Sequence, residues 1–260
     1  MYVLMTDESN REPSKEAKFF IYGGVLFPAD IFETLHNEVE QIREDAGYKR
    51  CDEFKFNIRS RPEYVKREDC TKAKRKVIKL CQKTGCKFIA YIILHDIAIN
   101  QTDRIKMTYA ADALFGRFNE FLQIKDSIGI CVVDNLSITA QYKYLAEKFA
   151  IGLHMPDGEK PLDNILLYTA TCINASHVSS IIDIVLGSFR YCINNPQNTE
   201  IAKKMMKDVL KIMWHERIGE DYDVRKMGLI VRPMLHEIRK QLYKEQYDIL
   251  LEHINLLLED

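Results

Sequence analysis

The sequence has no long apolar run, and this absence excludes several classes of protein. No uninterrupted apolar stretch approaches the roughly 20 residues that a membrane helix needs. Residues 1–8 have neither a basic region nor a long apolar stretch, so we expect no signal peptide. The 11 glycines and 7 prolines are scattered without a period, which excludes collagen-like and low-complexity chains.

Motifs of several common sites are also missing. The seven cysteines form no C-x-x-C pair, which argues against both a disulfide framework and a zinc ribbon. The seven histidines show no H-E-x-x-H spacing, and Gly23-Gly24 lacks the Gly-Lys-Ser/Thr ending of a phosphate loop. We therefore expect a cytoplasmic globular protein with reduced thiols. Three cysteines in apolar contexts are expected to be buried and inert: Cys131, Cys172 and Cys192.

The charge is small in total but unevenly distributed. The 260 residues are 47% hydrophobic, enough for a sizeable core, and carry a net charge of −1, which alone argues against a nucleic-acid partner. Residues 48–87, however, hold fourteen basic and five acidic residues, a net charge of +9, so the remainder carries −10. Such a segment is suited to a polyanion, and a solvated helix face is the alternative interpretation.

Within this basic segment, seven residues are candidates for nucleic-acid binding: Lys49, Arg50, Lys55, Arg59, Arg61, Lys72 and Arg75. Four aromatic residues are interleaved with them and are candidates for base stacking: Tyr48, Phe54, Phe56 and Tyr64. For Phe54 and Phe56, a place in the core is the stronger interpretation.

Hydrophobic periodicity predicts an α/β protein. Apolar runs predict strands at 2–6, 19–27, 88–97, 127–133 and 165–171. Amphipathic spacing predicts helices near 29–45, 69–83, 103–124, 138–151, 177–193, 198–215 and 233–258, with a loop at 153–164. This order favours a mixed central sheet, antiparallel at first and flanked by helices. We expect one domain at 1–195 and a helical C-terminal extension at 196–260 packed on it.

Two further patterns concern packing. The pair Gly23-Gly24 within a strand indicates a bulge or a close backbone approach. The last predicted helix has apolar residues at seven-residue spacing, namely Leu235, Leu242, Ile249 and Leu256. Core packing is the stronger interpretation of this spacing, and a homodimer contact is the alternative.

Carboxylates follow two of the predicted strands directly. Asp7 ends the first apolar strand and Asp134 ends a later one, and the ends of strands are where α/β proteins gather their active sites. Magnesium and manganese prefer hard oxygen ligands, and two ions about 3.5–4 Å apart are the usual clamp for phosphodiester hydrolysis. Taken singly, each aspartate is more often a turn former or a helix cap.

Asp183 lies in a different setting, on a predicted helix with apolar residues on both sides. Its own face carries Ser179, Gly187 and Arg190, and small neighbours would let the helix approach a sheet and aim one carboxylate inward. An ion pair between Asp183 and Arg190 is the alternative. His177, six residues earlier, is a candidate for proton transfer or for support of the site, against a helix-capping or solvent-exposed role.

These residues together resemble the motifs of a large bacterial family known only as domain of unknown function number thirty-eight hundred. Asp7-Glu8-Ser9 and Gly23-Gly24-Val25 resemble its opening strands, and Glu53-Phe54-Lys55 its Glu-x-Lys motif. Val132-Val133-Asp134 resembles its internal strand-end acid, and the segment around Asp183 its late helix motif. The chain departs from the family at Asn10, where Gly is usual, and at Ser180 and Ile182, where Gln and Ala are usual.

The resemblance implies a fold similar to ribonuclease-H-like nucleases and integrases. It also implies two divalent ions, Mg²⁺ or Mn²⁺, held by acidic residues. Carried over by position, the metal ligands would be Asp7, Glu53, Asp134 and Asp183, with Glu8 as a fifth, and Lys55 would lie near the scissile phosphate. The implied function is a metal-dependent nuclease or related phosphoryl-transfer enzyme, in a phage-defence or mobile-element setting.

Two other functions remain open. The departures at Ser180 and Ile182 motivate a non-catalytic nucleic-acid-binding protein or a subunit of a larger complex. A metal-dependent hydrolase of a nucleotide-like small molecule is the third hypothesis.

Overall fold

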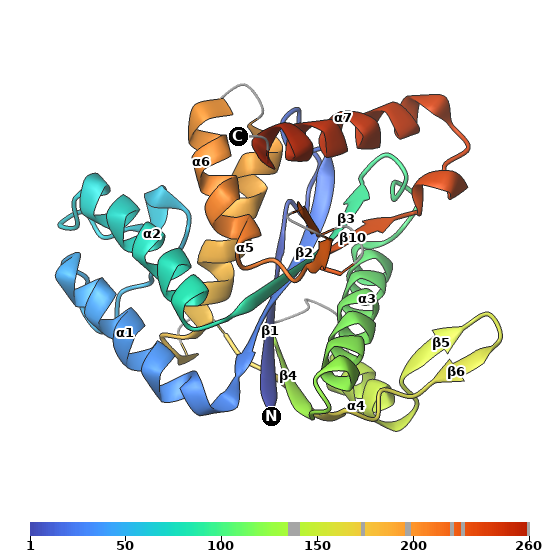
Figure 1. Ribbon diagram of the computed structural model, residues 1–260, viewed down its shortest axis with the longest axis horizontal. Helices are drawn as coiled ribbons and strands as arrows, with labels where there is room; N and C mark the ends of the chain where they lie inside the picture. Colours follow the sequence, from blue (N-terminus) through green and yellow to red (C-terminus); the bar gives the residue numbers. More distant parts are fainter. Residues whose placement is uncertain (135–140, 173–174, 196–198, 219–220, 225–226, 259–260) are drawn as a thin grey trace.

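The computed structural model describes residues 1–134, 141–172, 175–195, 199–218, 221–224 and 227–258. Its centre is a six-stranded sheet with the strand order β10-β3-β2-β1-β4-β7 (Figure 1). The sheet strands are β1 (Tyr2–Ser9), β2 (Phe19–Pro28), β3 (Lys87–Leu94), β4 (Gly129–Val133), β7 (Ile165–Ala170) and β10 (Leu229–Arg232). The helices are α1 (Phe32–Asp45), α2 (Arg67–Lys83), α3 (Asp103–Ile124), α4 (Gln141–Ala150), α5 (Ser179–Asn194), α6 (Thr199–Leu210) and α7 (Gln241–Leu258).

The sheet is mixed, as predicted. The first three strands form an antiparallel meander, with β1 paired to β2 and β2 to β3. On the other side of β1, β4 and then β7 run parallel to it, and β10 runs parallel to β3 at the opposite edge. The α/β class with a mixed central sheet flanked by helices is therefore confirmed.

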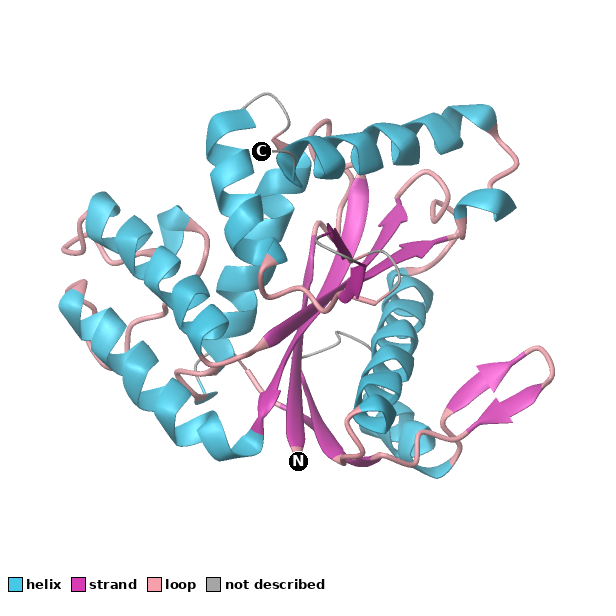
Figure 2. Ribbon diagram, viewed as in Figure 1, coloured by secondary structure: helices cyan, strands magenta, loops and turns pink. Residues whose placement is uncertain are grey.

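Helices cover both faces of the sheet (Figure 2). On one face α3 packs against β2 and β3; on the other, α5 packs against β1 and β2, and α1, α2, α6 and α7 surround it. Strand β2 is buried on both faces, since Phe20 and Tyr22 belong to one core and Ile21 and Val25 to the other. This explains why its sequence is a continuous apolar run.

The glycine pair in β2 allows neighbours to approach closely. A Cβ at Gly23 would lie 2.7 Å from Leu186 of α5, and one at Gly24 would lie 2.6 Å from Leu4 of β1. The ladders of β2 with β1 and β3 run through both positions without a shift. The predicted close approach is confirmed, and a bulge is not formed.

Several predicted elements need correction. Residues 153–164 contain a hairpin of β5 (Leu153–Met155) and β6 (Gly158–Lys160) rather than a loop throughout. Strand β3 ends at Leu94 and helix α6 ends at Leu210, both earlier than predicted. The helix predicted to begin at residue 233 begins at Gln241. Pro233 follows β10, and a short 3₁₀ turn, Leu235–Glu237, precedes α7. The start of the helix predicted at 138–151 lies outside the described residues.

Residues 196–260 are not an all-helical extension, which corrects the prediction. They contain a small hairpin, β8 (Glu216–Ile218) with β9 (Asp221–Asp223), and the strand β10, which pairs with β3 in the central sheet. Leu229 and Ile230 of β10 are buried, each in a different core. The two predicted ranges therefore share one sheet.

Helix α7 is tied to this shared sheet through one hydroxyl group. Tyr247 is fully buried, its hydroxyl donates to the carbonyl oxygen of Arg232 at 2.6 Å, and it accepts the backbone N–H of Leu94 at 2.8 Å. We expect Tyr247→Phe to lower the free energy of unfolding by about 1–3 kcal/mol, because both backbone groups lose their partner in a buried place.

Urea denaturation measures this effect, with Tyr243→Phe as the matched control. Tyr243 lies on the same helix, is only half-buried, and its hydroxyl accepts from Lys240 at 3.5 Å in an exposed contact. A change at Tyr247 no larger than the one at Tyr243 would contradict the prediction.

The four residues at seven-residue spacing differ in their surroundings: Leu235, in the 3₁₀ turn before α7, is partly buried and packs against the core as predicted. Leu242 and Ile249 are 63% and 58% exposed, so core packing is wrong for them; the core contacts of α7 come from Tyr247, Leu250 and Ile254. The side chain of Leu256 lies outside the described residues, and the homodimer contact stays a prediction.

Two of the three cysteines that were expected to be buried lie in the protein interior. Cys131 and Cys192 are buried as predicted, but Cys172 is exposed, because it follows the end of β7 at the rim of the sheet.

Among the described residues, none of the helices combines the length and the apolar composition needed to cross a membrane.

Candidate functional site

Strand pairing brings two acidic residues together. Because β1 and β4 are parallel neighbours with Thr6 opposite Val133, Asp7 and Asp134 follow at the same edge of the sheet. The backbone N–H of Asp134 donates to the carbonyl oxygen of Thr6 at 3.2 Å, which extends this pairing to the site. Carboxylate oxygens of Asp7, Glu8 and Asp134 all lie within 4.8 Å of one another. The structure therefore brings together three of the five predicted metal ligands.

Asp183 reaches the same group from α5, the helix that packs on β1. Its charge is the largest electrostatic influence on Asp7, ahead of those of Glu8 and Asp134. One carboxylate oxygen of Asp183 accepts the backbone N–H of Phe56. The alternative interpretation, an ion pair with Arg190, is not found in the described parts of the chain; the Arg190 guanidinium lies 6.0 Å from the centre of the Phe56 ring.

Burial disfavours the ionisation of these carboxylates, and for Asp7 the neighbouring negative charges add to it. Burial, followed by the charges of Asp183, Glu8 and Asp134, raises the pKa of Asp7 to about 8. Burial likewise raises the pKa of Glu8 and of Asp183, although Arg11 opposes the shift at Glu8 and the Phe56 N–H opposes it at Asp183. A cation bound among these groups would remove the cost of holding them ionised.

Lys55 supplies a positive charge beside the carboxylates. Its ammonium lies 2.8 Å from a carboxylate oxygen of Glu53. The hydrogen bond to Glu53 raises the pKa of Lys55, against burial, and Asp183 and Asp134 contribute further. Lys55 therefore lies within electrostatic range of two of the candidate carboxylates, and its role near a phosphate stays a prediction. Glu53 pairs with Lys55 and does not belong to the group of three carboxylates within 4.8 Å.

A buried arginine that the sequence did not single out orders the chain before Glu53. The Arg43 side chain, 5% exposed, donates to the carbonyl oxygens of Lys49 at 3.0 Å and Asp52 at 2.7 Å. These bonds fix residues 49–52 against α1. No signal in the sequence separated Arg43 from the other charged residues of this helix, because its partners are backbone carbonyl groups.

Both backbone polar groups of Phe56 are likewise hydrogen-bonded to side chains. Its N–H donates to Asp183, and its carbonyl oxygen accepts the ammonium of the buried Lys74 at 2.7 Å. A Cβ at Gly187 would lie 2.4 Å from Phe56, so this glycine admits the aromatic ring against α5. We predicted that the small residues beside Asp183 would let α5 approach a sheet. At Gly187 the missing side chain instead makes room for the ring of Phe56.

The predicted nucleic-acid-binding residues lie in three settings. Lys49, Arg50 and Arg59 are exposed in loops or short turns. Arg61 is half-buried and donates to the carbonyl oxygens of Val65 and Ile58, so it also holds its own loop. Lys72 and Arg75 are exposed on α2.

Of the four aromatic candidates, Tyr64 and Phe56 remain accessible. Tyr64 is 54% exposed with the Lys49 ammonium 4.6 Å from its ring centre, and Phe56 is half-buried. Phe54 is in the core, as predicted, but a place in the core is wrong for Phe56, which lines a pocket. Tyr48 is also buried and its hydroxyl donates to the sulfur of Cys70, so base stacking is wrong for Tyr48.

His177 belongs to a different group of side chains. Its Nδ1 accepts a hydrogen bond from Arg43 at 3.0 Å, and its Nε2 lies 3.5 Å from Glu40. Because arginine only donates, the neutral ring carries its proton on Nε2 and directs it toward Glu40. Burial lowers the pKa of His177, and the Arg43 charge adds to this. These contacts hold α1 against the start of α5.

A recess of about 20 Å³ lies where β4 ends beside β1, and Asp7 and Asp134 both line it. This volume admits one water-sized guest. The polar groups that line it are the carboxylates of Asp7 and Asp134, the hydroxyls of Thr6, Thr171 and Ser179, and the thiol of Cys172. Hard divalent cations prefer oxygen donors of this kind, so the residues fit Mg²⁺ or Mn²⁺.

No protein-family model matches this sequence, and no curated protein is detectably similar to it.

Proposed function

We propose that the protein is a divalent-metal-dependent nuclease with a ribonuclease-H-like fold. The observation that carries the proposal is the convergence of Asp7, Glu8 and Asp134 where β4 ends beside β1, with Asp183 of α5 within electrostatic range of Asp7. Together with Lys55, these residues come from four separate segments of the chain. The resemblance of motifs assigns all four segments to one site. An antiparallel meander followed by strands parallel to β1 supports the same fold.

The proposed cofactor is a pair of Mg²⁺ or Mn²⁺ ions. Asp7, Glu8 and Asp134 would hold one ion, and Asp183 and Glu53 are the further carboxylates for a second. When bound, such ions lower the pKa of water and stabilise the attacking and leaving oxygens of a phosphodiester. The raised pKa values of Asp7 and Asp183 support a site adapted to a cation.

The protein side chains would orient the substrate. Lys55 lies within electrostatic range of Asp183 and Asp134, so its ammonium would approach a non-bridging phosphate oxygen once a cation takes over the carboxylates. The exposed cations Lys49, Arg50 and Arg59 would hold backbone phosphates further along the strand. The substrate class is therefore a polynucleotide, and its binding would weaken as salt rises.

Metal dependence provides the test. We expect purified protein with Mn²⁺ or Mg²⁺ to cut at least one of four end-labelled substrates: single- and double-stranded DNA and RNA. Chelation with EDTA should abolish cleavage, because the carboxylates alone repel a polyanion. Gel analysis of the products also separates cleavage within a strand from cleavage at its ends.

The matched variants are Asp183→Asn, which should lose cleavage by about 100-fold or more, and Asp163→Asn, which should keep it. Asp163 is exposed and precedes β7, so it lies at the N-terminal ends of the parallel strands, whereas Asp134 follows the C-terminal end of β4. Cleavage that survives EDTA, or that Asp183→Asn leaves intact, would contradict the proposal. Salt-sensitive binding with no cleavage of any substrate would favour the non-catalytic binding protein instead.

A further inference from the structure

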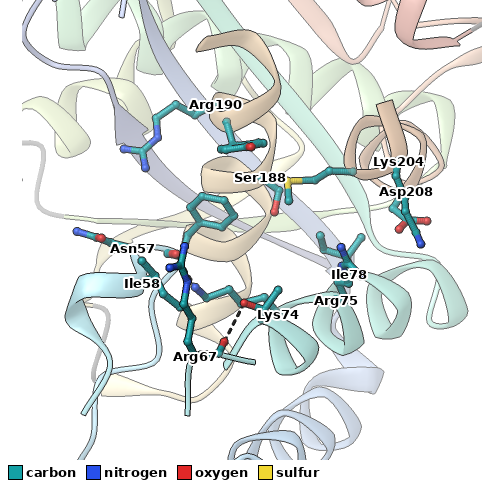
Figure 3. A pocket seen from close by; sticks show the side chains of 14 residues that line it. Asn57, Ile58, Arg67, Lys74, Arg75, Ile78, Ser188, Arg190, Lys204 and Asp208 are labelled. Carbon is teal, nitrogen blue, oxygen red and sulfur yellow. Dashed lines mark hydrogen bonds between the residues drawn. The ribbon is translucent and has the colours of Figure 1, made fainter. Parts of the chain in front are cut away.

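A pocket of about 300 Å³ lies between three helices, separate from the small recess at the carboxylates (Figure 3). Arg67, Lys74 and Arg75 line it from α2, Arg190 from α5 and Lys204 from α6, and the segment 56–58 completes it. The residues thus come from four separate parts of the chain. Its volume is at the lower end of the range for small-molecule sites.

The pocket carries a strong excess of positive charge. Five basic side chains line it against one acidic side chain, Asp208, which also forms an ion pair with Lys211 at 3.9 Å. Lys74 is buried, whereas Arg67, Arg75 and Lys204 are exposed. Basic side chains that converge from three helices on one cavity favour an anion with several oxygens, such as a phosphate.

The pocket also offers an apolar surface. The ring of Phe56 lines it, with the Lys74 ammonium 5.3 Å and the Arg190 guanidinium 6.0 Å from the ring centre. Ile58, Ile78 and Met205 add further apolar lining. An aromatic ring beside cations is the combination with which proteins hold a nucleobase or sugar together with its phosphate.

One peptide unit connects this pocket to the carboxylates. The N–H of Phe56 donates to Asp183, and its carbonyl oxygen accepts from Lys74 in the pocket. A strand whose reacting phosphate lies at Asp183 therefore has a neighbouring nucleotide within reach of the pocket.

We infer that the pocket between α2, α5 and α6 binds a single phosphate-bearing nucleotide of the substrate strand, next to the nucleotide whose phosphodiester is cut. This inference rests on the proposed nuclease function and adds the ligand of a second subsite. A volume of about 300 Å³ admits one nucleotide and not a duplex, so the bound nucleotide is unpaired.

The test is calorimetric titration in EDTA, where cleavage does not occur, with adenosine 5′-monophosphate, adenosine 3′-monophosphate and adenosine as probes. We expect one saturable site for at least one monophosphate, with adenosine binding at least tenfold more weakly. Arg75→Glu and Lys204→Glu, on two different helices and both at exposed positions, should each weaken that site at least tenfold.

Lys79→Glu is the matched control, because Lys79 is exposed on α2 but does not line the pocket. Thermal melts establish that all three variants fold. The inference is overturned if neither monophosphate saturates a site, if adenosine binds as well as they do, or if Lys79→Glu weakens binding as much as Arg75→Glu.

Competition with short single strands identifies the source of the nucleotide. Oligonucleotides with a 5′-phosphate, a 3′-phosphate or no terminal phosphate are titrated against the bound monophosphate. Displacement by any of them supports a strand nucleotide, and the most effective one shows whether a 5′ end, a 3′ end or an internal position is held. If none displaces the monophosphate, the assignment to a strand is overturned. Because EDTA is present, these results do not depend on whether the protein cuts nucleic acid.

Discussion

Asp7→Asn should abolish cleavage and, in the absence of metal, stabilise the protein at neutral pH. The amide keeps the size of the side chain but removes the charge that would bind a cation, so we expect activity to fall by about 100-fold or more. The same change removes a carboxylate whose burial and acidic neighbours disfavour ionisation. Opposite effects on activity and stability distinguish a functional acid from a structural one.

The sign of the pH dependence follows from the pKa of Asp7. It is about 8 in the folded protein, against an ordinary value of 3.8. Between these values the folded state retains a proton that the unfolded state has released, so the contribution of Asp7 to stability is complete below pH 3.8 and is lost as the pH rises to about 8. Asparagine does not titrate, and its advantage over aspartate should therefore grow across this window.

Urea denaturation of metal-free protein at pH 5 and pH 8 measures the difference. We expect Asp7→Asn to exceed wild type by roughly 1–3 kcal/mol at pH 8 and by less at pH 5. Added Mn²⁺ should reverse the order at pH 8, since it binds the folded wild type more tightly. A variant that is less stable than wild type at both pH values, with or without metal, would show that Asp7 is ionised and satisfied in the folded protein.

Gly187→Ala is expected to impair the site through the Phe56 segment. The added Cβ would lie 2.4 Å from the Cβ and Cγ of Phe56, so the ring must move, and its backbone carries the N–H bonded to Asp183. We expect about 10- to 100-fold less cleavage, because displacement of about 1 Å can cost two orders of magnitude. Overpacking should also cost about 1–3 kcal/mol, partly offset by the higher helix propensity of alanine.

Gly85→Ala is the control for a loss of stability without a change at the site. Gly85 has a positive φ of 74°, and a Cβ there would meet nothing within 4 Å, so the substitution strains the backbone at the end of α2 and nothing else. Cleavage is compared at a temperature where both variants are folded. Equal activity of Gly187→Ala and Gly85→Ala would contradict the proposed role of Gly187.

Long elements with a clear period were predictable from the sequence. Helix α3 has the predicted bounds, 103–124, since the Thr102 side chain caps it by accepting the N–H of Ile105. Strand β10 was missed because four residues carry too little pattern and its partner, β3, is far away in the sequence. Helix α7 was predicted to begin too early because apolar residues precede it in a 3₁₀ turn.

The candidate site was predictable where acids follow apolar runs, although β1 continues past Asp7 to Ser9 and only Asp134 lies at a strand end. Asp7 and Asp134 each follow an apolar run, and parallel pairing brings them together. The supporting residues Arg43 and Lys74 were not predictable as such, because they bind backbone carbonyl groups of loops whose paths the sequence does not specify. The pocket beside Phe56 was missed for a related reason: Arg190 and Lys204 lie outside the basic segment and join it only through the packing of α5 and α6 against α2.

The position of β10 also has a consequence for protein synthesis. Ala90 of β3 pairs with Leu229 of β10, so the edge of β3 that β10 covers stays unpaired until most of the chain has left the ribosome. Until then the nascent protein presents an apolar strand, residues 87–94, with free backbone groups along one side. Such an edge can pair with a second nascent chain. We therefore expect a chain truncated before β10 to aggregate during expression, which the fraction of soluble protein measures.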